Sequence, residues 1–264
     1  MSGGRTVMVT GAAGGIGRAL VERLVAAGDR VLATDLAGAA LRAVGEGREQ
    51  VRARPLDERH ARDWDEAFAA AEASFGPVDV LINNAGCLTA GWIHELDPHD
   101  IAAQLDVNAK GVALGTAAAA RRMVARGSGH IVNVASLAAL APISGLAVYS
   151  ASKYAVRALS LAAALDLAPH GVAVSVVCPD AVRTAMLDKQ RDRPEAAMTF
   201  TGTALDAAAV ARVIVDEVLP RRPREVYLPR RRGWLARAAD VFPALAARLD
   251  GPMRRRGIER QSGG

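Results

Sequence analysis

Short apolar runs alternate with longer stretches of helical periodicity along most of the chain. The apolar runs predict seven strands, at residues 6–9, 30–34, 51–54, 78–83, 130–135, 172–178 and 225–228. Segments rich in Ala, Leu and Arg predict five helices, at residues 15–27, 61–75, 98–126, 149–169 and 206–219. Because strands and helices alternate at this spacing, the pattern predicts a doubly wound α/β fold with a seven-stranded parallel sheet.

Two stretches interrupt the alternation. Residues 180–205 connect a predicted strand to a predicted helix and carry scattered apolar side chains, which predicts a mobile lid over a substrate site. Residues 230–264 are basic and carry apolar positions at helical spacing, namely Trp234, Ala238, Val241, Phe242, Leu245 and Leu249. Pro243 predicts a break within this amphipathic helix. The sequence therefore predicts a single domain over residues 1–229 with a helical tail over residues 230–264.

The composition is typical of a protein with a sizeable hydrophobic core. The 264 residues are 51% hydrophobic and 23% charged, which excludes wholesale disorder. No apolar stretch reaches the roughly 18 to 20 residues of a membrane span, and the first residues lack a signal-peptide pattern, so we expect a cytoplasmic protein. Cys87 and Cys178 stand far apart without metal-ligand spacing, so the sequence predicts free thiols and no metal site.

The positive charge is concentrated at the C-terminus. The formal net charge is +5, but the segment from Arg221 onward carries twelve arginines against four acidic residues, which leaves the rest of the chain net negative. This distribution argues against a nucleic-acid-binding face spread over the domain. We expect the tail to pack against its own or a neighbouring subunit, with peripheral contact to an anionic membrane as the alternative.

A glycine-rich turn, TGAAGGIG at residues 10–17, directly follows the first predicted strand and opens the first predicted helix. Its glycines let the backbone turn tightly around a pyrophosphate, and the N-terminus of the following helix stabilises the anion. Asp35 follows the second predicted strand, where a carboxylate can accept hydrogen bonds from an adenosine ribose. These features predict a dinucleotide-binding Rossmann fold over residues 1–229.

Asp35 also bears on the choice between NAD and NADP. A carboxylate repels the ribose 2′-phosphate of NADP, and no Arg or Lys stands at residues 12, 13, 36 or 37 to offset the repulsion. The sequence therefore favours NAD, although the cation of Arg18 lies close to the turn along the chain.

Tyr149 and Lys153 stand four residues apart in a predicted helix, so their side chains share one face. Interconversion of an alcohol and a carbonyl needs a group that gives or takes a proton at the oxygen. A tyrosine can do so when its pKa is lowered by a nearby cation such as Lys153 and by an oxidised nicotinamide ring. With three Tyr and three Lys in 264 residues, this spacing arises by chance only about 0.03 times. Ser136, which follows the fifth predicted strand, completes a candidate proton-transfer site.

Over about residues 5–228 the chain resembles the classical short-chain dehydrogenase/reductase family. The matching positions, in order, are the glycine-rich turn, Asp57, the sequence NNAG at residues 83–86, Asn108, Ser136, Tyr149 and Lys153. The resemblance implies that Tyr149 is the general acid/base and that Ser136 hydrogen-bonds the substrate oxygen. It further implies that Lys153 lowers the pKa of Tyr149 and binds the nicotinamide ribose, and that Asn108 holds a water linking Lys153 to solvent.

The resemblance also implies a set of cofactor contacts, which are Gly11, Gly15, Ile16, Gly17, Asp35, Asp57, Asn84, Tyr149, Lys153, Val182 and Thr184. The chain departs from the family where Pro179 is followed by Asp180 instead of the usual glycine. A glycine adopts a positive φ more readily than an aspartate does, so Asp180 is expected to alter this loop or to face the substrate.

Apolar residues near these motifs predict the substrate wall: Leu88, Leu137, Leu140, Ile143, Leu146, Met186 and Leu187. Such a lining favours an apolar secondary alcohol or ketone, with hydride exchanged with NAD. Arg157 and Arg183 keep a carboxylate or a 3-oxoacyl thioester open as the substrate, and a non-catalytic NAD-binding regulatory protein is the other alternative. By resemblance we expect a homodimer or homotetramer through the predicted helices at residues 98–126 and 149–169.

Overall fold

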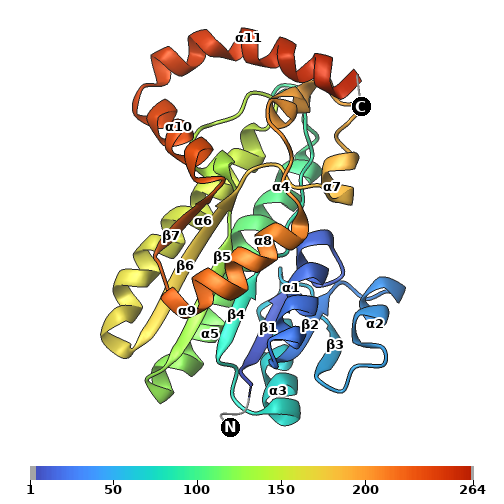
Figure 1. The fold of residues 1–264 in the computed structure, drawn as a ribbon, viewed down its shortest axis with the longest axis vertical. Coiled ribbons are helices and arrows are strands. Elements are labelled where there is room, and N and C mark those ends of the chain that lie inside the picture. The colour runs from blue at the N-terminus through green and yellow to red at the C-terminus, as the bar shows by residue number, and fades with distance from the viewer. Residues whose placement is uncertain (1–3, 263–264) are drawn as a thin grey trace.

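A parallel sheet forms the centre of the fold (Figure 1). The computed structural model describes residues 4–262, apart from the side chains of residues 245, 246 and 262. The strands in this range are β1 (Thr6–Thr10), β2 (Arg30–Asp35), β3 (Val51–Pro55), β4 (Val80–Asn83), β5 (Gly129–Val134), β6 (Val172–Pro179) and β7 (Glu225–Leu228). Their order is β3-β2-β1-β4-β5-β6-β7, with every neighbouring pair parallel. The predicted seven-stranded, doubly wound sheet is confirmed.

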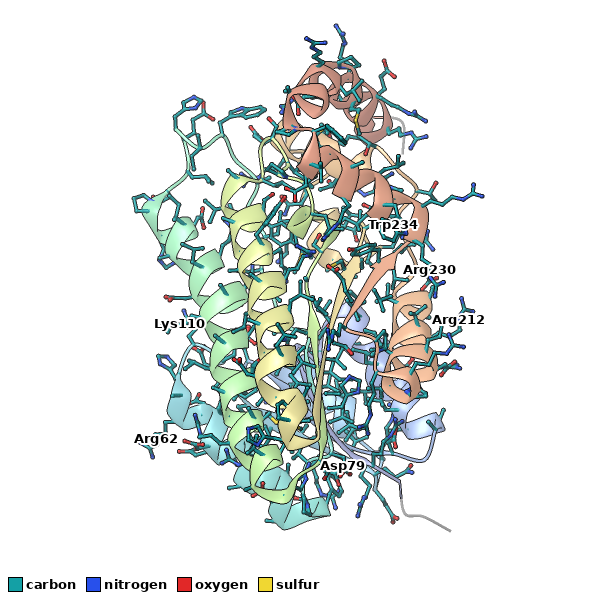
Figure 2. The ribbon with its side chains drawn as sticks, turned by 90° about the vertical axis from the view of Figure 1, so that its left-hand side faces the viewer. Arg62, Asp79, Lys110, Arg212, Arg230 and Trp234 are labelled. Carbon is teal, nitrogen blue, oxygen red and sulfur yellow. The ribbon has the colours of Figure 1, made fainter. Side chains whose placement is uncertain are left out.

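Helices cover both faces of the sheet because the side chains of each strand point alternately to the two sides. In β1, Val7 and Val9 belong to one core cluster and Met8 to the other. The first cluster packs against α1 (Gly15–Ala26), α8 (Ala207–Val213), the π-helical η5 (Ile214–Val218) and α9 (Leu219–Arg221). The second packs against α3 (Ala61–Phe75), α5 (Val112–Arg126) and α6 (Ala147–Leu167). Figure 2 shows the two layers edge-on, with Lys110 on one side and Arg212 on the other.

The predicted helices are present with shifted ends, and the helix predicted at residues 98–126 is interrupted. It consists of α4 (Pro98–Leu105), a π-helical turn η1 (Asp106–Gly111) and α5. The pattern did not predict α2 (Ala39–Gly45) or α7 (Ala185–Asp188), which have only seven and four residues. Helices this short leave too few apolar repeats to be recognised in a sequence. The remaining short elements are the 3-10 turns η2 (Leu137–Ala139), η3 (Ala168–His170) and η4 (Pro194–Phe200).

The tail forms two helices, α10 (Arg230–Val241) and α11 (Pro243–Ser262), beyond the carboxyl ends of the strands (Figure 1). They meet at Phe242, whose φ of −121° and ψ of 63° are not helical. Pro243 is the first residue of α11, a position where its missing N–H leaves no hydrogen bond unmade. The tail therefore breaks where the sequence places Pro243.

The tail packs against its own chain, since Gly257 contacts η4 and Arg232 pairs with Asp180, but the apolar side chains predicted as its packing face are mostly exposed. Trp234, Val241, Phe242 and Leu249 are 65%, 63%, 60% and 50% exposed, and the side chain of Leu245 lies outside the described residues. Once the two helices point in different directions, positions that share one face of a continuous helix no longer do so. Among the described helices, none is both long and apolar enough to cross a membrane.

Candidate active site

A cavity of about 1600 Å³ lies at the carboxyl ends of the strands, where the sheet order reverses between β1 and β4. The glycine-rich turn lines one end of it, and the segments that follow β4, β5 and β6 line its middle. Residues of the lid and the tail line the other end. The catalytic and cofactor-binding residues predicted from the sequence line this cavity, except Asn108, which is fully buried and hydrogen-bonded to Cys87.

The backbone of the glycine-rich turn leaves no room for side chains at two positions. A Cβ on Gly17 would lie 2.0 Å from the Gly11 carbonyl oxygen. Gly11 has a φ of +63°, and a Cβ there would lie 2.8 Å from the Ala85 Cα. The Asn84 side chain fixes the same turn by donating a 2.9 Å hydrogen bond to the Thr10 carbonyl oxygen. The turn and the segment after β4 therefore form one rigid unit.

The N-terminus of α1 is open toward the cavity. Its N-cap is Gly14, so no side chain accepts from the first-turn N–H groups, and Gly15, Ile16 and Gly17 line the cavity. A Cβ on Gly15 would lie 2.5 Å from the Thr184 Cγ2, so the turn and the segment after β6 approach each other closely. The uncapped N–H groups at this helix N-terminus can donate to a pyrophosphate, and the glycines have no side chains that would keep a dinucleotide away from the backbone.

Asp35 stands at the end of β2 and lines the cavity. Its carboxylate accepts from the Ala13 N–H at 2.9 Å and from the Leu36 N–H at 2.8 Å, which orients it toward the turn. The Arg18 side chain donates to the Ala13 carbonyl oxygen at 3.0 Å and is not part of the cavity wall. The negative group thus faces the cavity, and the nearby cation points elsewhere.

Asp57 and Arg59 line the same end and form an ion pair at 2.6 Å. Hydrogen bonds from the Arg59 side chain lower the pKa of Asp57 to about 2, so its carboxylate is ionised at any neutral pH. Asp57 therefore offers a fixed acceptor at one of the positions that the resemblance implies as cofactor contacts.

The candidate proton-transfer residues come together from two elements. Ser136 follows β5 and is the N-cap of η2, where its hydroxyl accepts from the Ala138 N–H at 3.1 Å. Tyr149 and Lys153 lie one turn apart on α6, and the Lys153 ammonium is 5.7 Å from the centre of the Tyr149 ring. Lys153 donates to the Val134 carbonyl oxygen at 3.1 Å, and the Ser136 and Tyr149 side chains are hydrogen-bonded to each other. The phenol thus has a hydroxyl and an ammonium beside it.

Burial dominates the pKa values of this pair. Burial raises the pKa of Tyr149 to about 12, and the hydrogen bond with Ser136 only partly opposes that rise. The lowering predicted from the sequence requires the oxidised nicotinamide ring as well as Lys153, so it stays a prediction for the complex with the cofactor. Burial also lowers the pKa of Lys153 to about 8, against the attraction of the Glu58 carboxylate. Both shifts favour the neutral forms and reflect removal from water.

Asn108 lies in the π-helical turn η1 and holds the segment after β4. Its Oδ1 accepts from the Cys87 N–H at 2.8 Å, and its Nδ2 donates to the Cys87 carbonyl oxygen at 2.9 Å and to the Ser152 hydroxyl at 3.1 Å. A Cβ on Gly86 would lie 3.1 Å from the Asn108 Oδ1 and 3.5 Å from the Lys153 Nζ. Asn108 and Lys153 therefore border the same narrow space beneath Gly86.

Glu58 is a buried acid that the sequence reasoning missed. Neither carboxylate oxygen has a hydrogen-bond partner among the described residues, and its side chain packs against Gly111, where a Cβ would lie 2.7 Å from the Glu58 Cγ. Burial raises the pKa of Glu58 to about 8, although the positive charge of Lys153 acts against the rise.

The segment after β6 contains the departure from the family pattern. Asp180 lines the cavity and forms an ion pair at 2.7 Å with Arg232 from the tail. Asp180 does not have a positive φ, since among the described residues Arg222 is the non-glycine residue that has one. Burial raises the pKa of Asp180, and the Arg232 charge opposes the rise. Asp180 therefore faces the cavity, as one of the two predicted alternatives has it, and its side chain also joins two segments.

The far end of the cavity is mostly apolar. Of the residues predicted as its wall, those that line it are Leu88, Leu137, Ile143, Leu146, Met186 and Leu187. Leu140 is wrong, because it is 1% exposed and packs in a core cluster. Arg157 pairs with Glu225, and Arg183 donates to the Ala204 carbonyl oxygen at 3.0 Å, so neither lines the cavity. The sequence reasoning also missed the tail residues at this end, which include Leu235, Ala239, Leu249 and Met253.

Comparisons with known proteins agree with this geometry. The family model described as short chain dehydrogenase matches residues 5–195. A 2-(R)-hydroxypropyl-CoM dehydrogenase of Xanthobacter autotrophicus is 37% identical over 253 residues, which cover 92% of this chain and 91% of that protein. A 3-alpha-(or 20-beta)-hydroxysteroid dehydrogenase of Mycobacterium tuberculosis is 34% identical over 213 residues, covering 80% and 81%.

Solved structures show the same fold. A short-chain dehydrogenase/reductase from Burkholderia phymatum in complex with NAD has a TM-score of 0.76 and 30% identity, covering 85% of this chain and 88% of that one. A variant of actinorhodin polyketide ketoreductase with NADPH has a TM-score of 0.78 and 30% identity, covering 85% and 95%. This chain belongs to the short-chain dehydrogenase family. It is an oxidoreductase that acts on CH–OH groups and binds a nicotinamide cofactor.

Proposed function

We propose that this protein is an NAD-dependent dehydrogenase of an apolar secondary alcohol, or a reductase of the matching ketone. The observation that carries the proposal is the arrangement of Tyr149, Ser136 and Lys153 in the middle of the cavity. On one side lie an uncapped helix N-terminus and the Asp35 carboxylate, and on the other an apolar chamber.

Tyr149 is the proposed general acid/base at the substrate oxygen. With a pKa of about 12 the phenol is protonated at neutral pH, which is the form that donates to the oxygen of a ketone as it is reduced. Ser136 hydrogen-bonds the same oxygen and orients it toward the phenol. A bound nicotinamide cofactor supplies or accepts the hydride.

Lys153 is the proposed partner that makes proton release from Tyr149 possible in the oxidation direction. Its ammonium lies beside the ring and favours a developing phenolate, because opposite charges attract strongly where water is excluded. The Asn108 side chain already has its hydrogen bonds to Cys87 and Ser152, so we assign it the role of holding η1 and the loop beneath Lys153 in place.

The cofactor preference rests on charge. The Asp35 carboxylate faces the cavity, where it accepts from ribose hydroxyls and repels a ribose phosphate. Two cations lie close along the chain to the cofactor motifs, and each already has a partner. Arg18 donates a hydrogen bond to the Ala13 carbonyl oxygen, and Arg59 forms an ion pair with Asp57. Asp57, Asn84, Val182 and Thr184 complete the proposed cofactor site. This balance favours NAD.

A homodimer or homotetramer formed through α5 and α6 remains part of the proposal. Leu165 on α6 is 61% exposed, and the small residues of both helices permit close approach of a second copy. Light scattering of the purified protein measures the mass directly, and a monomer at all concentrations would remove this part.

The function is tested by following NADH absorbance with purified protein, NAD or NADP, and a panel of apolar secondary alcohols. Turnover with NAD supports the proposal. Turnover of a 3-oxoacyl thioester, without turnover of any apolar alcohol, would favour the second candidate substrate. Neither Arg157 nor Arg183 is placed to bind such a substrate in the cavity. Tight NADH binding without turnover of any substrate would favour a non-catalytic regulatory protein.

A further inference from the structure

The exposed apolar side chains of the tail fall into two groups. Leu235, Leu249 and Met253 are 70%, 50% and 39% exposed, and all three line the cavity together with Met186 from the lid. Trp234, Val241 and Phe242 are similarly exposed but lie outside the cavity wall. The exposure of the first group is therefore exposure toward the site, where an apolar ligand could cover these side chains.

Two side-chain bonds hold α10 against the catalytic part of the chain. Tyr154, on the catalytic helix α6, donates to the Asp240 carboxylate at 2.7 Å. Arg232 pairs with Asp180 at 2.7 Å, directly after β6. These bonds place Leu235, Ala236 and Ala239, which lie between Arg232 and Asp240, along the cavity. One of these contacts lies at each end of residues 232–240, so the segment is held in place along the cavity.

The lid holds α11 in a similar way. A Cβ on Gly257 would lie 2.0 Å from the Ala197 carbonyl oxygen, so the helix and η4 are in backbone contact. Arg260 donates to the Thr201 carbonyl oxygen at 2.9 Å, and Gln261 donates to the Arg193 carbonyl oxygen at 2.9 Å. Farther toward the start of α11, the Arg254 guanidinium stacks on Trp92, with its Cζ atom 4.3 Å from the centre of the ring. The tail and the lid are thus one assembly.

Four charged tail residues line the cavity. Arg232, Asp240 and Asp250 have partners in Asp180, Tyr154 and Arg254, respectively, whereas Arg256, in the second half of α11, makes no hydrogen bond or ion pair among the described residues. The side chains left to contact a ligand along α10 and the first half of α11 are mostly apolar. A ligand with an extended apolar body would bind more tightly here, by roughly fourfold in affinity per buried methylene.

We infer that α10 and α11 form the distal wall of the substrate site and select an alcohol or ketone with an elongated apolar body. The inference rests on the proposed function, and it specifies the substrate class. The carbinol end lies at Tyr149 and Ser136, and the body extends past the lid to Leu235, Ala239, Leu249 and Met253. The family match ends at residue 195, so this wall belongs to a part of the chain outside the family model.

A matched pair of substitutions on α10 tests the inference. Ala239 lines the cavity, whereas its neighbour Ala238 is exposed outside it. Ala239→Phe fills the chamber and Ala238→Phe adds the same ring to the outer surface. The probes are 2-alkanols of about 4 to 12 carbons with saturating NAD, chosen so that each added methylene extends the apolar body.

For the wild type we expect kcat/KM to rise at least about 10-fold along the series, in line with burial of the added methylenes. Ala239→Phe should lower kcat/KM for the longest alcohols by at least about 10-fold and leave the shortest within about twofold. Ala238→Phe should follow the wild type throughout. A flat wild-type series, or two variants that behave alike, would overturn the inference while leaving the proposed function intact.

A binding arm keeps the inference testable if no 2-alkanol is turned over. Titration calorimetry with 2-dodecanone should show binding to the wild type and to Ala238→Phe, and at least about 10-fold weaker binding to Ala239→Phe. Equal binding to all three proteins would contradict the distal wall. If Ala239→Phe fails to fold by circular dichroism, Leu235→Gln is the second variant, with the same expected loss.

Discussion

At the cofactor end of the cavity, Gly11 and Gly17 lie so close to neighbouring backbone that an added Cβ would overlap it. At the substrate end, the wall is joined instead by side chains from distant segments, such as Asp180 with Arg232 and Tyr154 with Asp240. The first end is determined by backbone geometry within the sheet edge. The second depends on ion pairs and hydrogen bonds between the lid, α6 and the tail.

This difference predicts how each end tolerates substitution. A change at the cofactor end must either move backbone or remove a group that we propose contacts the dinucleotide, so we expect its effect on function to be large. A change at the substrate end replaces one side-chain contact among several, so it alters specificity and stability by smaller amounts. Tyr149 lies at the junction of the two ends, where the chemistry is proposed to occur.

The largest effect is expected at this junction. Tyr149→Phe removes the phenolic hydroxyl with little loss of volume, so turnover of a confirmed substrate should fall at least about 10²-fold. The Kd for NADH should change less than about twofold, because ring and backbone remain. Steady-state kinetics and fluorescence titration measure the two quantities.

Tyr154→Phe is the matched control, since Tyr154 lies on the same helix and donates to Asp240 outside the proposed chemistry. It should retain most of the wild-type kcat. If Tyr149→Phe kept half of the wild-type rate, the assignment of the acid/base would be wrong.

The next largest effect concerns the cofactor end. Wild-type protein should bind NADH more tightly than NADPH by about 1 to 3 kcal/mol, the scale of a charged hydrogen bond together with repulsion of a phosphate. Asp35→Ala should narrow this gap mainly by weakening NADH binding. Fluorescence titration with both cofactors gives the Kd values.

Arg18→Met serves as the control for Asp35→Ala, because the Arg18 side chain is bonded to the Ala13 carbonyl oxygen away from the cavity. It should leave the preference between the cofactors unchanged. Equal Kd values for NADH and NADPH in the wild type would contradict the assignment of Asp35.

A third prediction uses the buried Glu58. Its pKa is about 8 in the folded protein against 4.5 for the ordinary group, so between these values the folded state holds a proton that the unfolded state has lost. Stability from this group is complete below pH 4.5 and is lost as the pH rises through 8. Glu58→Gln removes this dependence and should raise the free energy of unfolding at pH 8 relative to wild type by about 2 kcal/mol.

Urea unfolding at pH 5 and pH 8 measures the effect of Glu58→Gln. The exposed Glu22 provides the control, and Glu22→Gln should give the same difference from wild type at both pH values. A difference for Glu58→Gln that does not grow between pH 5 and pH 8 would show that the carboxyl is not held neutral.

The smallest effect is expected at the substrate end. Arg232→Met leaves Asp180 without its ion-pair partner, and we expect a loss of about 1 kcal/mol, or a fall in Tm of about 2 to 4 °C. Because the pKa of Asp180 is already raised by burial, the loss should be greater at pH 8 than at pH 5, where protonation relieves the unpaired charge. Differential scanning fluorimetry at both pH values measures the Tm.

Arg231→Met is the natural control for Arg232→Met, since Arg231 is exposed on the same helix turn. Its Tm should stay within about 1 °C of wild type. If Arg231→Met lowered the Tm as much as Arg232→Met does, the loss would come from removing any arginine of this turn. The ion pair between Arg232 and Asp180 would then contribute nothing specific to stability.

Much of the fold and the cofactor end could be predicted from the sequence because the signals are local. Strand periodicity, the glycine-rich turn and the four-residue spacing of Tyr149 and Lys153 each reflect a rule that acts within a few residues. Short helices such as α2 and α7 were missed for the same reason, since they carry too few repeats to show a pattern. The break in the tail was predicted because a proline acts on its own backbone.

By itself the sequence determined the alternation of strands and helices, the order of the motifs and the residues that line the cofactor end. Only the tertiary structure decided that Leu140 packs in the core, that Glu58 is buried without a partner, and that Arg232 reaches Asp180. It also decided the direction of the Tyr149 pKa shift and brought the tail to the substrate cavity. The physical reason is that burial, ion pairing and desolvation depend on which distant segments meet, and that is settled only when the whole chain packs.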